Sequence, residues 1–204
     1  MARSRDLKGP EARLAFTQGL WELQTTQSGK KQWNCTLLWP KTVDLGALKE
    51  LAVEAAVAEW GDKAKQMIKD GLIKSPFLDG DGPQGKSKKN GEPHSGFPGN
   101  TFVRCTSGED YRPKLVNQKV LPIVSKDDLK SGDYCFPVLN AFTWENDQNG
   151  KGITFGLSML QKTRSGDSLG GGGPAPDDVF EAIPDEGDAP ASTKTGGGAA
   201  GLFG

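Results

Sequence analysis

Residues 133–146 form the longest stretch of the chain in which side chains alternate in character, and this stretch constrains the fold most strongly. Successive side chains of a β-strand point to opposite faces. One face would carry Tyr134, Phe136, Val138, Asn140, Phe142 and Trp144, and the other would carry Cys135, Pro137, Leu139, Ala141 and Thr143. A turn sequence, NDQNGKG, follows at 146–152, and residues 153–164 alternate again with Ile153, Phe155, Leu157 and Met159 on one side. The pattern predicts a long antiparallel hairpin.

Further strands are expected before this hairpin. Residues 13–24 and 31–40 form a first predicted hairpin, with Ser28 and Gly29 in the turn and Pro40 at the end of the second strand. Strands are also expected at 101–107 and 114–124, on either side of a short turn.

One helix is predicted between these strands. It follows Asp44, which can cap it, has apolar residues at helical spacing through Trp60, and continues weakly to Gly71. Residues 75–100 are rich in Gly, Pro, Asp and Lys and predict a long loop. We therefore expect a mainly β protein, an OB-fold-like antiparallel barrel of five or six strands with one main α-helix after the second strand.

Charge divides the chain into two parts. The 204 residues carry 25 basic and 26 acidic side chains, a net charge of −1. Residues 1–166 hold 24 basic and 19 acidic side chains, or +5, whereas residues 167–204 hold Lys194 against seven acids, or −6. The second part is rich in Gly and Pro and lacks an apolar period, which predicts a flexible acidic tail. We expect a binding domain at 1–166 and this tail at 167–204.

Several classes of function lack support in the sequence. His94 is the single histidine, and no nucleophile-elbow, zinc-protease, Walker A or dinucleotide motif is present. Cys35, Cys105 and Cys135 lack the close spacing of zinc ligands and are expected in the core as reduced thiols. We expect neither an enzyme, a cofactor nor a metal site. No apolar run has the length of a membrane helix, and the N-terminus lacks the apolar region of a signal peptide.

Several aromatic residues of the first part lie close to basic residues, as Trp33 does to Lys31 and Tyr111 does to Arg112. Proteins that bind single-stranded nucleic acid combine aromatic rings, on which bases stack, with Lys and Arg side chains that contact phosphates. The candidate stacking residues are Trp33, Trp39, Phe102, Tyr111, Phe142 and Trp144. The candidate phosphate contacts are Lys30, Lys31, Lys86, Lys88, Lys89, Arg104, Arg112 and Lys151. The alternation does not reveal which face of each strand forms the groove.

The acidic tail suggests a regulatory role. A flexible anionic segment tethered to a basic groove competes with nucleic acid at high effective concentration. Its apolar residues could also recruit other proteins. The candidate tail and partner residues are Phe180, Asp185, Glu186, Asp188 and Phe203.

Several sequence motifs together resemble a phage family of single-stranded DNA-binding proteins, formerly described as a domain of unknown function. They are WNCTLLWPK, the helix ending in Trp60, PFLDGD at 76–81, the GDYCFPVLNAFTWEN strand and GKGITFGLSMLQ. That family is similar to the replication-associated binding proteins of T7-like phages, which have an OB-fold body and an acidic C-terminal tail. The resemblance covers about residues 10–165 and implies binding rather than turnover. In the T7-like tails the acids reach a terminal Phe, whereas here Phe203 is penultimate and GGGAAGL separates it from the acids.

The sequence thus predicts a protein that binds single-stranded DNA without strong sequence preference in phage replication and recombination, in the cytoplasm of the infected bacterial host. Its expected partners are single-stranded DNA and, through the tail, phage or host replication and recombination proteins; a homodimer is another expectation. Two alternatives stay open. One is an RNA-binding OB module, which would use the same aromatic residues, and the other is a structural or scaffold protein.

Overall fold

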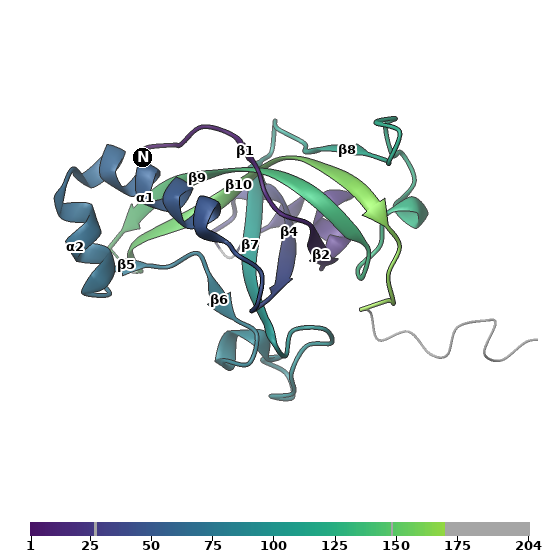
Figure 1. Ribbon diagram of the computed structural model, residues 1–204, viewed down its shortest axis with the longest axis horizontal. Helices are drawn as coiled ribbons and strands as arrows, with labels where there is room; N and C mark the ends of the chain where they lie inside the picture. The colour runs from purple at the N-terminus through teal and green to yellow at the C-terminus, as the bar shows by residue number, and fades with distance from the viewer. Residues whose placement is uncertain (27, 148, 170–204) are drawn as a thin grey trace, which may run out of the picture. The chain divides into compact units, whose positions relative to one another are not determined.

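The computed structural model describes residues 1–26, 28–147 and 149–169, and within them one mixed sheet dominates (Figure 1). The ten strands of the sheet are β1 (Leu7–Lys8), β2 (Ala12–Ala15), β3 (Gln24–Thr25), β4 (Lys31–Pro40), β5 (Ile73–Lys74), β6 (Leu78–Asp79), β7 (Asn100–Gly108), β8 (Lys114–Val116), β9 (Tyr134–Asn146) and β10 (Gly150–Arg164). The helices are α1 (Gly46–Trp60), α2 (Lys63–Lys69) and three short 3₁₀ segments, η1 (Thr17–Leu20), η2 (Pro83–Gly85) and η3 (Lys126–Asp128). The expectation of a mainly β protein is confirmed.

The β9–β10 hairpin is the longest pairing in the molecule, as its alternating sequence predicts. The face of β9 with Cys135, Leu139 and Ala141 is buried, whereas the aromatic residues of the other face are partly exposed. We call the first the inner face and the second the outer face. A β-bulge between Leu157 and Met159 interrupts the alternation of β10. The bulge explains why Met159 is exposed although Ile153, Phe155 and Leu157 are buried.

The main strand pairings return to the strand on which they begin. β9 pairs with β10 and with β2, β2 pairs with β4, β4 pairs with β7, and β7 pairs with β10. The β7–β10 pair is parallel, and β5 and β8 also run parallel to β10. The expectation of a wholly antiparallel sheet is therefore wrong. In the described part of the chain, no hairpin joins β7 to β10. The chain between them, which includes β8 and β9, is long enough for β10 to return beside β7 in the same direction.

The core lies between the inner faces of the strands and α1. Leu48, Leu51, Ala55 and Ala56 of α1 are fully buried, and α1 contacts β9 and β10. The Asp44 carboxylate accepts a hydrogen bond from the Gly46 backbone N–H at 2.8 Å, so the predicted capping residue does satisfy a donor of the first turn. The helix predicted between Asp44 and Trp60 is therefore confirmed.

Three predicted elements differ in detail. Gly61, with φ of +68°, ends α1, so the weak helical pattern up to Gly71 forms the separate helix α2. The predicted strand 13–24 is divided into β2, η1 and β3. The predicted strand 114–124 keeps only β8, because the Asn117 side chain accepts hydrogen bonds from Lys119 and Leu121 and closes a turn after it.

Two further observations concern the described residues as a whole. All three cysteines are buried, as expected, and burial raises the pKa of the Cys35 thiol to about 12. In this part of the chain no helix is both long and apolar enough to span a membrane.

Candidate nucleic-acid interface

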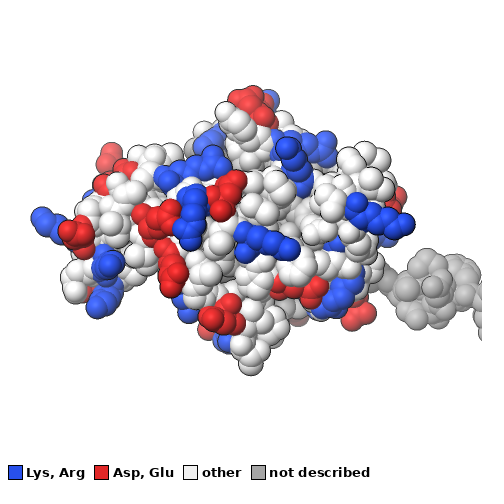
Figure 2. Space-filling model, turned by 45° about the horizontal axis from the view of Figure 1, so that its top comes forward, with Lys and Arg blue, Asp and Glu red and all other residues white. Residues whose placement is uncertain are grey.

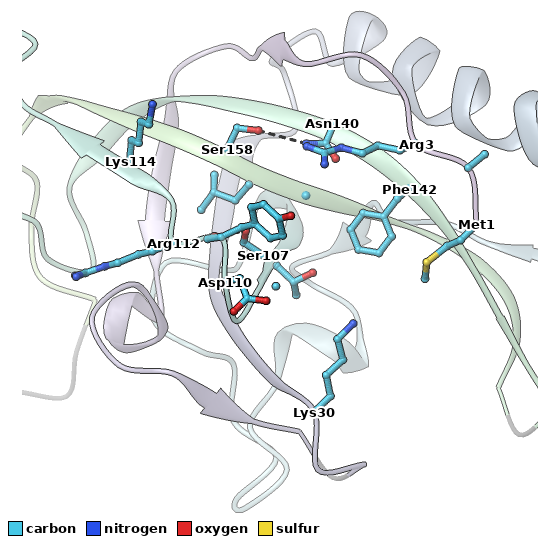
Figure 3. Close-up of a pocket in the computed structure, with 16 residues that line it drawn as sticks. Met1, Arg3, Lys30, Ser107, Asp110, Arg112, Lys114, Asn140, Phe142 and Ser158 are labelled. Carbon is cyan, nitrogen blue, oxygen red and sulfur yellow. Dashed lines mark hydrogen bonds between the residues drawn. The ribbon is translucent and has the colours of Figure 1, made fainter.

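A groove with a volume of about 690 Å³ opens over the outer face of the sheet (Figure 3). Its floor comes from β7, β9 and β10, and its rim comes from the N-terminus, the turn before β4 and the segment between β7 and β8. We call it the main groove. The residues that line it and are used below are Arg3, Lys30, Tyr111, Arg112, Lys114, Asn140, Phe142, Gly156 and Ser158.

The floor of the main groove is fixed by Asn140 and Gly156, which pair across β9 and β10. Asn140 is buried, and its side-chain amide donates hydrogen bonds to Asp6 at 3.0 Å and to Ser158 at 3.3 Å. A Cβ atom on Gly156 would lie 2.5 Å from the Asn140 side-chain oxygen. Glycine at 156 therefore allows a polar, ordered floor beneath Phe142, whose partly buried ring lies two residues further along β9.

Tyr111 provides the most exposed aromatic ring of the rim, with 76% of its surface accessible. Its backbone is held by a turn in which Tyr111 N–H donates to the Gly108 carbonyl at 2.9 Å, while the Ser107 hydroxyl donates to the Tyr111 carbonyl. The ring thus stands on a fixed backbone at the edge of a groove. Such an exposed ring can stack on a planar ligand.

Arg112 links the rim to two tryptophans. Its guanidinium carbon lies 5.1 Å from the ring centroid of Trp33 and 5.7 Å from that of Trp21. Figure 3 shows the side chain extending away from Phe142. Trp33 is partly buried, and its indole N–H donates to the Glu109 carbonyl at 2.9 Å. Trp33 therefore supports Arg112 and the 109–112 segment, and only part of its ring remains accessible.

The N-terminal segment forms one wall of the main groove, which the sequence did not suggest. β1 pairs with β9 at Leu139 and Val138, and Arg3 forms an isolated bridge with Phe142. The Met1 amine forms an ion pair with Glu59 at 2.8 Å. These pairings carry Arg3 to the groove beside Phe142 (Figure 3). No local pattern marks this segment, because its place depends on pairing with a strand 130 positions away.

A smaller hollow, of about 490 Å³, continues along the same outer face. Its lining includes Trp144, Arg104, Lys74 and Thr154. Thr154 pairs with Phe142, and Gly152 pairs with Trp144, so the hollow and the main groove share the outer faces of β9 and β10. A Cβ atom on Gly152 would lie 2.2 Å from the Trp144 ring, so the indole packs directly on the backbone of β10.

The structure therefore brings six of the predicted residues to one surface. Lys30, Tyr111, Arg112 and Phe142 line the main groove, and Arg104 and Trp144 line the adjoining hollow. These residues come from four separate segments of the chain: the turn before β4, β7, the segment between β7 and β8, and β9.

Two predicted stacking residues must be corrected. Trp39 and Phe102 have no accessible surface, and Trp39 donates its indole N–H to the Pro10 carbonyl at 3.2 Å. Phe102 points to the outer side of the sheet, but Phe97 covers it with a ring-to-ring distance of 4.8 Å. The segment after β6 thus forms a second small core on this side, and neither ring can stack on a base.

The other predicted basic residues are more scattered. Lys31 and Lys151 form ion pairs with Glu109 and Glu145, at 3.5 Å and 3.2 Å. Lys151 also lies opposite Glu145 and near Trp60 rather than on the outer face. Lys86, Lys88 and Lys89 are exposed on segment 80–99, which projects below β6 and β7 in Figure 1. They do not line the main groove or the adjoining hollow.

The PFLDGD motif holds a neighbouring segment in place through two of its carboxylates. The Lys41 ammonium lies 2.7 Å from a carboxylate oxygen of Asp79 and 2.7 Å from one of Asp81. Asp81 also accepts a hydrogen bond from the Gly99 backbone N–H at 3.0 Å. The hydrogen bonds and charge of Lys41 lower the pKa of both carboxyls. The motif therefore ties both ends of segment 80–99 to the end of β4.

Basic side chains are spread over the molecule and acidic ones lie between them, as the face in Figure 2 illustrates. The density of basic side chains on a face therefore does not by itself mark the main groove. Among the described residues, no carboxylate lies within 4 Å of the charged groups of Lys30, Arg112 or Lys114. Asp110 is the acidic residue of the lining, and Arg3 lies 3.7 Å from Asp6.

The described residues contain no group of three or more His, Cys, Asp or Glu side chains arranged to hold a metal ion. The predicted tail residues Phe180, Asp185, Glu186, Asp188 and Phe203 lie outside the described residues.

The fold and this surface define a class of protein, a mainly β protein whose outer sheet face carries aromatic and basic residues. The family model of the single-stranded DNA-binding protein of Enterobacter phage Enc34 matches residues 7–190, and the chain belongs to this family. The resemblance inferred from the sequence motifs is thereby confirmed. The family consists of DNA-binding proteins that are not enzymes, in agreement with the expected absence of catalysis.

Individual relatives are distant. A putative protein, p50, of Acyrthosiphon pisum secondary endosymbiont phage 1 is 25% identical over 184 residues, which span 87% of this chain and 93% of the relative. The solved Enc34 protein in complex with single-stranded DNA has a TM-score of 0.55 at 19% identity, and covers 81% of this chain and 89% of its own. Gp2.5, a single-stranded DNA-binding protein of bacteriophage T7, has a TM-score of 0.50 at 11% identity, over 93% of this chain and all of its own. The structural matches show a shared fold.

Proposed function

We propose that this protein binds single-stranded DNA in the main groove and the adjoining hollow, without strong sequence preference. The observation that carries the proposal is the outer face of β9, where Phe142 and Trp144 are partly exposed and line the main groove and the adjoining hollow together with basic side chains, while the inner face forms the core. Aromatic rings stack on any base, and Lys and Arg side chains neutralise phosphates. We further propose that the closed circuit of strand pairings is an OB-type barrel.

The proposed biological role is to coat DNA strands exposed during phage replication and recombination, in the cytoplasm of the infected bacterial host. Membership in a phage family of single-stranded DNA-binding proteins supports this role. A homodimer remains a proposal as well, and sedimentation of the protein with and without DNA tests it.

The tail after Leu169 is proposed to compete with DNA for the basic surface and to recruit replication or recombination proteins. Its sequence supports this, since residues 170–204 contain six acidic side chains and Lys194 as the single basic one. A tethered polyanion acts at high effective concentration and is displaced by salt. Deletion of 170–204 keeps the hydrogen bond from Leu169 N–H to the Ser131 carbonyl and removes these acids. It should tighten DNA binding at low salt, and unchanged affinity would exclude the competition.

The direct test of the proposed function is a titration of intrinsic tryptophan fluorescence with poly-dT, poly-U and duplex DNA at several salt concentrations. We expect quenching by poly-dT and an affinity that falls as salt rises. Stronger binding to poly-U would favour an RNA-binding module, because RNA offers 2′-hydroxyl contacts. Absence of binding to any of the three at low salt would favour a structural or scaffold protein.

A further inference from the structure

A second hollow, of about 500 Å³, lies beyond the rim of the main groove on the far side of Arg112. Its lining includes two aromatic rings, Phe16 and Trp21, and two lysines, Lys126 and Lys130. We call it the Phe16 hollow. Neither the sequence nor the comparison with known proteins assigns it a role.

Phe16 has an unusual backbone. It adopts φ of 52° and ψ of 51°, the left-handed region that bulky side chains rarely occupy, and half of its surface is exposed. Strained residues of this kind concentrate at functional sites. The ring is held in place by His94 and Phe97, whose centroids lie 5.1 Å and 5.6 Å away. Phe16 therefore presents a fixed, partly exposed ring to the hollow.

Arg112 joins the Phe16 hollow to the main groove. It lines the main groove, and its guanidinium lies over Trp21, which lines the Phe16 hollow. One of its nitrogens also lies 3.4 Å from the Leu20 carbonyl, which it contacts as a donor. Trp21 carries the one buried side-chain donor of the described residues that lacks a hydrogen-bond partner, its indole N–H. Unsatisfied buried donors are rare and call for a functional or structural explanation.

We propose that the Phe16 hollow binds a base of the same DNA strand that occupies the main groove, stacked on Phe16 after the strand passes Arg112. This inference rests on the proposed function. The charges of the lining balance, since Lys126 and Lys130 are matched by Glu22 and Asp127. Stacking rather than phosphate neutralisation therefore supplies most of the affinity at this site, and its contribution depends little on salt.

The test uses the full-length protein and two fluorescently labelled dT oligonucleotides, one of about 5 and one of about 15 nucleotides. These lengths span the range of site sizes of proteins that bind single-stranded nucleic acid. Phe16→Ala should weaken binding of the long oligonucleotide by about ten-fold and leave binding of the short one nearly unchanged, because one lost base stack has roughly this effect. Phe16→Tyr keeps a ring and should retain the affinity. Leu23→Ala, at a partly exposed apolar residue outside the hollow, is the matched control.

Phe142→Ala in the same assay separates the two proposals. Weaker binding of both oligonucleotides by Phe142→Ala, with no length-dependent effect of Phe16→Ala, would overturn the Phe16 inference and leave the proposed function standing. Unchanged binding of both oligonucleotides by Phe142→Ala would overturn the proposed function and the inference with it. If circular dichroism shows that Phe16→Ala does not fold, the unmodified protein is crosslinked to 5-iododeoxyuridine oligonucleotides instead. Adducts on Phe16 or Trp21 with the long oligonucleotide would support the inference. Adducts in the main groove without adducts on Phe16 or Trp21 would contradict it.

Discussion

The two faces of β9 differ in what their side chains do, although they alternate along one strand. On the inner face, Cys135, Leu139 and Ala141 have no accessible surface and pack in the core. On the outer face, Phe142 and Trp144 remain partly exposed and lie beside cations. The two faces of the hairpin thus allow residues that stabilise the fold to be separated from residues expected to bind DNA. Variants of the inner face should reduce the free energy of unfolding, and variants of the outer face should reduce affinity for DNA.

The largest effect on stability is expected where the inner face ends in a buried ion pair. The Lys162 ammonium lies 2.8 Å from the Asp133 carboxylate, and their side chains are 14% and 6% exposed. Asp133→Ala leaves a buried lysine without a counter-charge, so we expect a loss of about 3–5 kcal/mol in the free energy of unfolding. Urea denaturation measures it. The exposed pair of Arg5 and Glu54, at 3.0 Å, is the control, and Glu54→Ala should cost about 1 kcal/mol or less. Equal effects at both pairs would contradict the assignment.

A second variant tests the inner face itself. Leu139→Ala opens a cavity among buried side chains and should reduce the free energy of unfolding by about 2–5 kcal/mol. Val138→Ala, on the adjacent outer position, is the matched control and should have a smaller effect because Val138 is only partly buried. Affinity of the folded protein for dT oligonucleotides should stay the same in both variants. A selective loss of affinity in Leu139→Ala at temperatures where it is folded would break the separation of the two faces.

Gly156→Ala tests the floor of the main groove, where one residue is expected to affect both stability and DNA binding. The added methyl group would lie 2.5 Å from the Asn140 side-chain oxygen and displace an amide that is hydrogen-bonded to Asp6 and Ser158. Overpacking of this kind costs about 1–3 kcal/mol. We expect a moderate loss of stability together with weaker DNA binding, measured by thermal denaturation and by fluorescence anisotropy. Full affinity in a destabilised variant would show that the floor does not contact the DNA.

The smallest effect concerns the part of the outer side that segment 80–99 covers. The pKa values of Asp79 and Asp81 are lowered by Lys41, so their ion pairs are present above the unfolded pKa of about 3.8 and are lost as pH falls through the lower, folded values. We expect hydrogen exchange in segment 80–99 to increase selectively in that acidic range. Lys41→Met should remove this pH dependence. A response that persists in Lys41→Met would assign it to other groups.

The hairpin was predictable because its alternation is local. The sequence of 133–146 predicts the strand and both sets of residues, but which set faces inward depends on α1, whose position is set by tertiary packing. The bulge after Leu157 has no marker in the alternation, and Met159 was therefore assigned to the wrong side. The parallel β7–β10 pair was missed for a similar reason, since it joins strands about 50 positions apart.

The candidate site was predictable in part. Tyr111 and Arg112 were found because an aromatic and a basic residue are adjacent in sequence, and Phe142 because it lies on one face of the alternating strand 133–146. Trp39 and Phe102 have the same kind of sequence surroundings, but they are buried, Phe102 under a segment whose fold depends on Lys41 and the PFLDGD motif. Arg3 and Phe16 were missed. The role of Arg3 depends on distant strand pairing, and that of Phe16 on a backbone conformation that no local pattern indicates.

The most direct test of the main groove as the DNA-binding surface is the affinity of the double variant Tyr111→Ala/Phe142→Ala for a dT oligonucleotide. An oligonucleotide of about 15 nucleotides is suitable, because this length lies within the range of site sizes of proteins that bind single-stranded nucleic acid. The two rings are partly or largely exposed, so the double variant should unfold at nearly the same urea concentration as the unmodified protein. We predict that its affinity falls by a factor of about 100, since each base stack contributes about 1–3 kcal/mol. Unchanged affinity in the folded double variant would contradict the assignment of the main groove as the DNA-binding surface.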